Sequence, residues 1–367
     1  MSVSFLFLHN LCEPKDYFGV IIMKKQTLCL IFGGKSREYS VSLKSCGCIL
    51  KHINRGKFEI HKIGITRDGE WYAYCGDECL IENGEWVYST EKYPVSLFIN
   101  TGEITYFCCG EEKRIKPDTV FPIIHGAYGE DGILHSVFDV MGIRCLGCDN
   151  EAGTLTVNKY LTKLIAKENG VPVAGFFVLN KGDTYTEDEI YKRAEKIGYP
   201  LFVKAVSSGS SVGVYKVENE KSLTLCIENA LEISHSVLVE KSISGVETEI
   251  AILERNGEII LGKIGQIEYE GDFYDYKAKY QNKSTRLIIP AKIGEECENL
   301  IKKYAKKLFS ATGCHGMCRA DFFVTENEGV VFNELNTVPG FTSGSMYPLL
   351  MTDSARSLSD LIDIICL

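Results

Sequence analysis

The residues whose types and spacing point most directly to chemistry lie in the stretch CRADFFVTENEGVVFNELNTVPG, residues 318–340. Both halves alternate with period 2 about a polar centre, which predicts a β-hairpin. In that hairpin Asp321 lies opposite Glu334, and Arg319 lies opposite Asn336. Directly opposed side chains are only about 4.5–5.5 Å apart at Cβ, where like charges are destabilising. Two carboxylates and an amide oxygen together suit a hard cation such as Mg²⁺, which binds oxygen ligands alongside substrate phosphates. The alternative is a solvated polar face of an antiparallel sheet.

This pairing depends on the register of the hairpin. It requires a turn around residues 326–329, centred between Asn327 and Glu328. With that register each arm presents three side chains on one face: Arg319, Asp321 and Phe323 on the first arm, and Phe332, Glu334 and Asn336 on the second.

A second informative stretch is FVKAVSSGSSVGVYKV, in which Lys204 lies in a buried strand and small residues follow over 207–213. Small residues let backbone N–H groups approach phosphate oxygens, and serine hydroxyls add further donors. The spacing is not that of a Walker A motif, so a plain hairpin turn remains the alternative. Lys204 itself predicts an anionic partner, because a buried lysine needs one to stay charged.

Three further stretches have a functional and a structural interpretation. The backbone of the segment LVEKSISGVE could hydrogen-bond the edge of an adenine, with Glu247 at the ribose, or the segment could be a linker. HGAYGEDG follows a buried strand, so His125 could contact a substrate, or the segment could be only a turn. The segment over Tyr276–Pro290 lacks a clean period and predicts a mobile lid, with nucleic-acid stacking as the alternative.

Three blocks of secondary structure must position these motifs. Residues 23–147 alternate strands, glycine turns and helices, which predicts an open parallel α/β sheet with ligand-binding loops at strand carboxyl ends. Residues 148–240 open with a helix and continue with strands and a second helix. Residues 241–367 alternate strand and turn, and then contain a long helix, the hairpin and a final helix. Residues 1–22 stand apart, as a disordered extension or the product of an upstream start codon.

Composition excludes several classes of protein. The chain has 367 residues and a net charge of −9, which argues against a nucleic-acid binder. It contains no apolar run of about 20 residues that could span a bilayer, and residues 1–22 make a poor signal peptide. The 15 cysteines are scattered, and neither the pair Cys145 and Cys148 nor the group Cys314, His315 and Cys318 supplies a full zinc ligand set.

In this order, the motifs GGKSREYSVSLKS, HGAYGEDG, VKAVSSGSSVGVYKV, EKSISGVE, YDYKAKY, CRADFF and NELNTVPGFTSGSMYP resemble the D-alanine–D-alanine ligases of the ATP-grasp superfamily. The resemblance runs from about Met23 to Leu367 and includes the variants that make D-Ala-D-Ser or D-Ala-D-lactate. It implies an α/β fold in which two ATP-grasp subdomains, 148–240 and 241–367, sandwich the nucleotide. It also implies a cytoplasmic homodimer that binds ATP, two Mg²⁺ ions (or Mn²⁺) and D-alanine for peptidoglycan precursor synthesis.

The resemblance further implies a role for each matching residue. The catalytic group would comprise Glu38, Ser210, Tyr280, Arg319, Gly340 and Ser345. The amino-acid substrates would contact His125, Ser345 and Met346. ATP would contact Lys159, Lys204, Ser207, Ser208, Ser210, Ser211, Glu240, Lys241, Ile243, Glu247, Lys279 and Asn333. The metal ions would be held by Asp321, Glu334 and Asn336.

The implied reaction begins when ATP phosphorylates the carboxylate of the first D-alanine. The neutral amine of the second amino acid then attacks the acyl phosphate, and phosphate leaves. Two rivals are a ligase for another acid and an inactive ATP-binding regulator. The segment SMYP with an intact Tyr280 favours D-Ala-D-Ala, whereas GITRDGEWY and GCDN are closer to the D-serine-forming branch.

Departures from the family pattern are few. Asn158 stands before Lys159 where an aspartate is usual, which puts a supporting contact in doubt. His135 and Ser136 replace a common Gln-Gly pair, and the histidine often found near Gly344 is absent.

Overall fold

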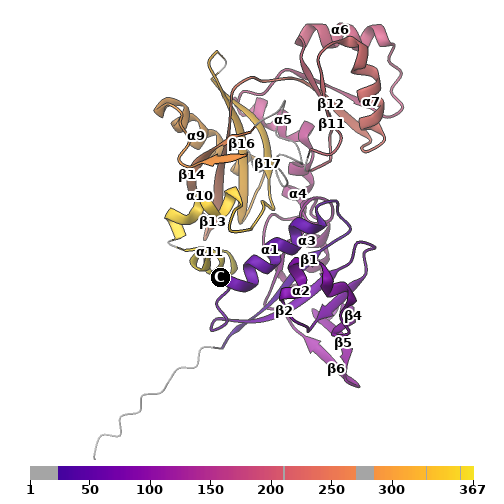
Figure 1. The fold of residues 1–367 in the computed structure, drawn as a ribbon, viewed down its shortest axis with the longest axis vertical. Helices are drawn as coiled ribbons and strands as arrows, with labels where there is room; N and C mark the ends of the chain where they lie inside the picture. The colour runs from indigo at the N-terminus through magenta and orange to yellow at the C-terminus, as the bar shows by residue number, and fades with distance from the viewer. Residues whose placement is uncertain (1–23, 210, 270–284, 328, 356) are drawn as a thin grey trace, which may run out of the picture.

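The computed structural model describes residues 24–209, 211–269, 285–327, 329–355 and 357–367. Their strands form three sheets, which Figure 1 shows as an N-terminal sheet at the bottom, a central one at the upper right and a third at the upper left. The extension of residues 1–22 and most of the predicted lid lie outside the described residues. Within the described chain, every helix is too short or too polar to cross a membrane.

The N-terminal sheet has the strand order β6-β5-β4-β3-β2-β1-β7-β8. Its strands β2, β1, β7 and β8 are parallel, as the sequence predicts, and an antiparallel extension continues the sheet from β3 to β6. The strands are β1 (Gln26–Gly33), β2 (Phe58–Ile65), β3 (Trp71–Tyr74), β4 (Lys92–Phe98), β5 (Glu103–Cys108), β6 (Glu111–Ile115), β7 (Thr119–Pro122) and β8 (Arg144–Cys145). The helices of this block are α1 (Tyr39–His52), α2 (Cys79–Glu82), the 3-10 turn η1 (Glu85–Tyr88) and α3 (Ile133–Val140).

The central sheet, β11-β10-β12-β9, is antiparallel throughout. Alternation along β10 points Leu201 and Val203 into the core under two helices, and leaves Lys204 on the other face. That second face forms one wall of the site described below. The strands are β9 (Phe176–Asn180), β10 (Leu201–Ala205), β11 (Val214–Val217) and β12 (Ser236–Lys241), and the helical segments are α6 (Glu187–Ile197), η2 (Glu220–Ser222) and α7 (Leu223–Leu231).

The third sheet, β15-β14-β13-β16-β17, is also antiparallel. Helices α5 and α9 pack on one face, where Ala166, Leu308 and Phe332 belong to one core. The strands are β13 (Val246–Arg255), β14 (Glu258–Glu268), β15 (Arg286–Ile288), β16 (Met317–Thr325) and β17 (Gly329–Asn336). The helices are α4 (Asn150–Val157), α5 (Lys159–Glu168), α9 (Glu295–Ala311), α10 (Met346–Ala355) and α11 (Leu358–Cys366).

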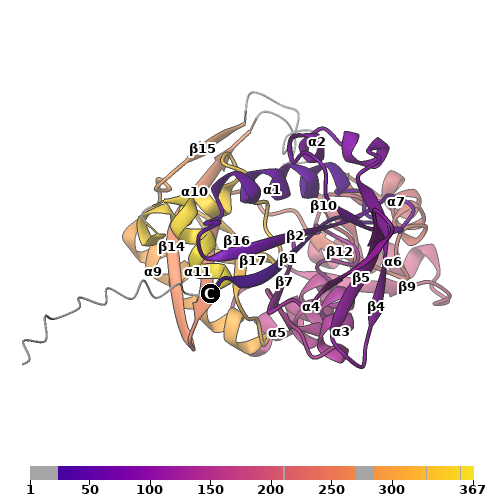
Figure 2. The ribbon, with the colours of Figure 1, turned by 90° about the horizontal axis from the view of Figure 1, so that it is seen from below.

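The first and third sheets are joined through the C-terminal helices. Figure 2 shows α10 and α11 beside α1, and residues of all three belong to one apolar core. An ion pair of 2.7 Å between Lys57 and Asp363 reinforces this contact. The N-terminal sheet is therefore fixed against the sheet that carries the hairpin.

A β-bulge changes the register of the β16–β17 hairpin. Asp321 pairs with Glu334 as predicted, but Phe322 pairs with Phe332, so Asn333 is an extra residue in β17. The bulge corrects one expectation: Phe332 does not share a face with Glu334. Phe332 instead lies in the helix-covered core beside Phe322, with ring centroids 5.7 Å apart.

Candidate functional site

The predicted site residues gather around two adjoining cavities, which share Lys159, Ser208 and Glu334 in their walls. The first, called here the inter-sheet pocket, lies between the central and third sheets. The second, called here the loop cavity, has a volume of about 520 Å³ and lies between the N-terminal block and the third sheet. A ligand in one cavity can therefore meet a ligand in the other.

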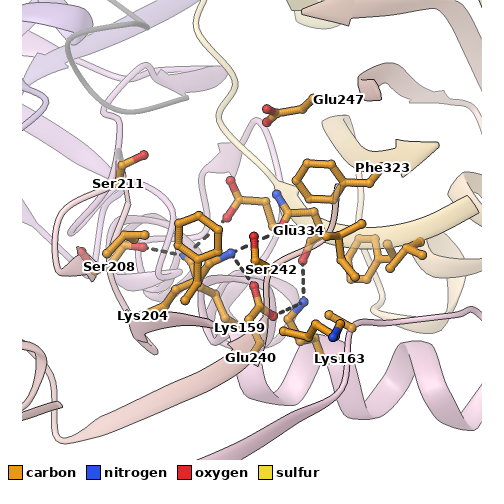
Figure 3. Close-up of a pocket in the computed structure, with 18 of the residues that line it drawn as sticks. Lys159, Lys163, Lys204, Ser208, Ser211, Glu240, Ser242, Glu247, Phe323 and Glu334 are labelled. Atoms are coloured by element: carbon orange, nitrogen blue, oxygen red, sulfur yellow. Dashed lines mark hydrogen bonds and ion pairs between the residues drawn. The ribbon is translucent and has the colours of Figure 1, made fainter. Parts of the chain in front are cut away.

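The floor of the inter-sheet pocket is a chain of three buried charges (Figure 3). The Glu240 carboxylate lies between two ammonium groups, 2.8 Å from Lys163 Nζ and 2.5 Å from Lys204 Nζ. Burial alone would raise the pKa of Glu240, but the two lysines lower it to about 2. Lys204 thus has the anionic partner that its place in a buried strand predicts.

Helix α5 supplies two lysines to this pocket from one face. Lys159 and Lys163 are four residues apart, which puts them on the same side of a helix. The helix begins at Asn158, whose side-chain oxygen accepts hydrogen bonds from the backbone N–H groups of Tyr160 and Leu161 at 3.1 and 3.0 Å. Asparagine in place of aspartate therefore keeps the helix cap.

Lys159 lies where the two cavities meet. Its ammonium donates a hydrogen bond of 2.6 Å to the carbonyl of Ser208 and is 3.4 Å from the carboxylate of Glu334. One lysine thus ties the serine-rich loop after β10 to the β16–β17 hairpin.

Arg319 lies between two buried carboxylates, and one of them belongs to the predicted metal ligand Asp321. Its Nε and Nη2 donate to the two oxygens of Asp321 at 2.8 and 2.7 Å, and Nε is 3.1 Å from Glu249. Burial opposes the charge, but the carboxylates outweigh it and raise the pKa of Arg319 well above its usual range. The like charges of the hairpin are therefore compensated by a guanidinium in this structure.

His125 is buried in the wall of the loop cavity, with 2% of its surface exposed. Its Nδ1 is 2.7 Å from the carbonyl of Val338 and its Nε2 is 3.0 Å from the hydroxyl of Ser45. Since a carbonyl only accepts, Nδ1 carries the proton and Ser45 donates to Nε2 in the neutral ring. Burial lowers the pKa of His125, which is consistent with this neutral form.

Glu38 projects into the loop cavity just before α1. A Cβ at Gly126 would lie 2.4 Å from its Oε2, and a Cβ at Gly209 would lie 2.9 Å from it. These glycines are needed for close approach, since any side chain at either position would displace the carboxylate.

Glu130 is a second carboxylate in the loop cavity, and it was not predicted. Burial, followed by repulsion from Glu38, raises the pKa of Glu130 to about 8. Glu334 adds repulsion and Lys159 opposes it. At neutral pH Glu130 is therefore mainly protonated in the folded protein and ionised in the unfolded chain.

Glu130 predicts a specific pH dependence of stability. Its folded-state pKa is raised, so its contribution to stability is lost as pH rises through about 8. We expect the wild type to lose about 1.4 kcal/mol of unfolding free energy between pH 7 and 9 relative to Glu130→Gln. Urea denaturation at both pH values measures this, with the exposed Glu151→Gln as control. Parallel pH profiles for the wild type and Glu130→Gln would contradict the assignment.

The structure brings most predicted site residues to the two cavities. The inter-sheet pocket is lined by the predicted residues Lys159, Lys204, Ser208, Ser211, Glu240, Lys241, Ile243, Glu247, Asn333 and Glu334. The loop cavity is lined by Glu38, His125, Lys159, Ser208, Arg319, Glu334, Asn336, Gly340, Ser345 and Met346. Asp321 and Ser207 line neither cavity, because Asp321 is buried behind Arg319 and Ser207 is exposed on the loop. Ser210, Lys279 and Tyr280 lie outside the described residues.

Four charged residues of the cavities were missed. Lys44 and Glu249 also line the loop cavity, as Glu130 does, and Lys163 lines the inter-sheet pocket. Only Lys163 had a usable signal, since its spacing of four from Lys159 places both on one helix face. Glu249 had none, because the sequence of its strand, VETEIAILER, does not reveal which distant residue a glutamate pairs with.

Two family models match the chain. The model described as the D-ala D-ala ligase N-terminus matches residues 27–148, and the one for the D-ala D-ala ligase C-terminus matches residues 165–366. Among curated relatives, D-alanine–D-alanine ligase B of Clostridium tetani is 40% identical over 94% of this chain and 94% of its own length. D-alanine–D-alanine ligase of Acetivibrio thermocellus is 39% identical over 92% and 94%.

Solved structures agree with these matches. The VanG D-Ala:D-Ser ligase from Enterococcus faecalis superposes with a TM-score of 0.82 at 36% identity, covering 93% of this chain and 98% of its own. The D-alanine-D-alanine ligase from Coxiella burnetii gives a TM-score of 0.82 at 28% identity, covering 93% and 92%. The likeness therefore extends over both cavities and all three sheets.

Proposed function

The chain belongs to the D-alanine–D-alanine ligase family, and we propose that its two cavities divide the family's reaction between nucleotide and amino acids. Its activity is the ATP-dependent joining of two D-alanine molecules into a dipeptide for the cell wall. One observation carries the division: a lysine-lined pocket and a carboxylate-lined cavity share Lys159, Ser208 and Glu334.

ATP binds in the inter-sheet pocket in this proposal. Lys159 and Lys204 contact the α- and β-phosphates, because an ammonium group is an effective point charge for phosphate. The loop of residues 207–213 covers the phosphates, with Lys279 at the γ-phosphate. The adenine lies against Glu240, Lys241 and Ile243, and the ribose against Glu247; Asn333 completes this wall.

Mg²⁺ fits the mouth shared by the two cavities. Asn336 and Glu334 both line the loop cavity, and the buried Asn336 Oδ1 atom has no hydrogen-bond partner among the residues that the structure describes. Among the described residues no group of three or more His, Cys, Asp or Glu side chains forms a metal site, and the proposed set has only two carboxylates. Glu334 and Asn336 would hold the metal with Asp321, which shares its oxygens with Arg319. Mg²⁺ would neutralise the phosphate charge during transfer.

The amino acids bind in the loop cavity. Glu38, in a group with Ser210 and Tyr280, holds the ammonium of the first D-alanine, and His125 orients that substrate. The carboxylate oxygen of this D-alanine attacks the γ-phosphorus, ADP leaves, and an acyl phosphate forms.

The second substrate then completes the reaction. Ser345 binds its carboxylate near Met346, and its neutral amine attacks the acyl carbon. Arg319 and the backbone N–H of Gly340 stabilise the oxyanion of the tetrahedral intermediate, which expels phosphate. The protein supplies position and charge, with no covalent nucleophile.

Phosphate release tests this function directly. We expect release with ATP, Mg²⁺ and D-alanine together, and none when any one is omitted. Release with another amino acid but not with D-alanine would indicate a ligase for a different substrate. Nucleotide binding without turnover would indicate an inactive regulator.

The second substrate is expected to be D-alanine. The thioether of Met346, which is 6% exposed at the loop cavity, offers no donor for a serine hydroxyl. An apolar pocket rejects an added hydroxyl only about 10²-fold, so some D-Ala-D-Ser should form at high D-serine. Competition between equal concentrations of D-alanine and D-serine, with products resolved by mass, measures the preference. A mixed dipeptide as the main product would instead support the D-serine-forming alternative.

The organisation around this reaction is also part of the proposal. We assign residues 23–147 to an N-terminal substrate-binding domain, 148–240 to a central ATP-grasp subdomain and 241–367 to the C-terminal one. The enzyme is a cytoplasmic homodimer in this proposal.

A further inference from the structure

We propose that Lys163 is a positioning residue that compensates the charge of Glu240 while Lys204 moves from Glu240 to the phosphates of the nucleotide. This inference rests on the proposed function, because it takes the inter-sheet pocket as the ATP site. The proposed role of Lys163 requires no contact with the substrate.

The two lysines differ in their access to the pocket. The Lys163 side chain is 2% exposed and the Lys204 side chain is 14% exposed, although both pair with the same carboxylate. Figure 3 shows Glu240 between them, with Lys163 toward helix α5 and Lys204 toward the serines of the loop. Of the two partners of Glu240, Lys204 is the one placed to reach an incoming phosphate.

Their remaining contacts differ in the same sense. Lys163 Nζ donates to the backbone carbonyl of Asn333 at 3.3 Å, whereas Lys204 Nζ donates to the side-chain amide oxygen of Asn333 at 3.4 Å. A carbonyl within a strand is fixed, but an amide side chain can rotate. Lys163 is therefore held in place, and Lys204 has contacts that it can exchange.

The charges give the exchange its physical reason. Two ammonium groups and one carboxylate carry a net charge of +1, which suits a pocket that receives an anion. When Lys204 turns to a phosphate, Glu240 keeps the ion pair with Lys163. Without Lys163, the same movement would leave Glu240 as a buried carboxylate with no counter-ion, which is strongly unfavourable. Nucleotide binding would then have to overcome the attraction that holds Lys204.

The test compares Lys163→Met with the double variant Lys163→Met/Glu240→Gln. We expect the single variant to raise KM for ATP at least tenfold, with less than a threefold change in kcat at saturating ATP. The double variant should have a KM for ATP at least fivefold below that of the single variant, because a neutral amide in place of the Glu240 carboxylate releases Lys204. Lys167→Met, an exposed lysine one turn further along α5, is the matched control and should leave KM unchanged.

Adenosine separates a charge exchange from a structural defect, since it has no phosphate to attract Lys204. Its inhibition constant as a competitor of ATP should change less than threefold in Lys163→Met. Equal losses for ATP and adenosine, an unchanged KM for ATP, or a double variant no better than the single one would each overturn the inference. If Lys163→Met does not fold, the double variant alone tests the inference. If Lys163 contacted phosphate directly, that contact would be lost in the double variant too, and the KM of the double variant for ATP would stay at least tenfold above that of the wild type. A wild type that adenosine does not inhibit, or that lacks turnover with D-alanine, would contradict the proposed function instead.

Discussion

Glu334→Gln is expected to lower kcat by a factor on the order of 10³, the size of effect seen when one electrostatic contact to a transition state is removed. The Glu334 carboxylate lies at the shared wall of the two cavities, 3.4 Å from Lys159. In the proposed function the transferred phosphoryl group passes this wall. Glutamine keeps the shape of the side chain but removes the charge that we propose to hold the metal.

The measurement is phosphate release at saturating and at limiting Mg²⁺, with urea denaturation to confirm the fold. Glu326→Gln is the matched control, since Glu326 is exposed near the turn of the same hairpin. Activity of Glu334→Gln near that of the wild type at limiting Mg²⁺ would contradict the assignment of this residue.

Asp321→Asn is expected to abolish turnover as well, but it is a less specific test. Both oxygens of Asp321 bind Arg319, and the carboxylate is 3% exposed. Breaking one side of a buried ion pair typically costs about 3–5 kcal/mol of stability. We therefore expect the fold to survive Glu334→Gln but to be destabilised by Asp321→Asn.

Arg319→Lys is the second change for which a large effect is expected. A lysine keeps the positive charge but cannot donate two parallel hydrogen bonds to Asp321 while also contacting Glu249. Because Arg319 is also proposed to bind the oxyanion, kcat should fall by about 10²–10³.

Phosphate release and urea denaturation together check this expectation. The matched control is Arg255→Lys, at the exposed end of neighbouring strand β13. A kcat for Arg319→Lys within threefold of the wild type would remove Arg319 from the proposed mechanism, whatever its effect on stability.

Alternation along the chain was enough to predict the opposed residues of the hairpin and the strand pair around Lys204. Both follow from the period of two in strands, which needs only local sequence. It also placed Glu240 and Lys204 in strands that the structure brings side by side, with Phe202 and Glu240 as direct neighbours in β10 and β12.

The residues that local sequence could not predict depend on contacts between distant segments. Lys163 on α5 and Glu240 on β12 are far apart in the chain, and they pair only where the folded chain brings these two elements together. The same holds for Arg319 and Glu249, which form an ion pair across the neighbouring strands β16 and β13. A charged side chain on one strand can neutralise an opposite charge on the next strand. The period of the sequence does not distinguish that arrangement from a bound cation.

The bulge at Asn333 also has a consequence for protein engineering. It gives the two halves of β17 opposite phase, so that Phe332 faces the helices and Glu334 faces the cavities. Deleting Asn333, or grafting the strand onto a regular hairpin, would make the side chains of β17 alternate without interruption between the two faces of the sheet. Either Glu334 and Asn336 would then enter the apolar core, or Val330 and Phe332 would leave it. The length of this strand is therefore as restricted as the identity of its polar residues, and a single-residue deletion here should be less tolerated than most substitutions.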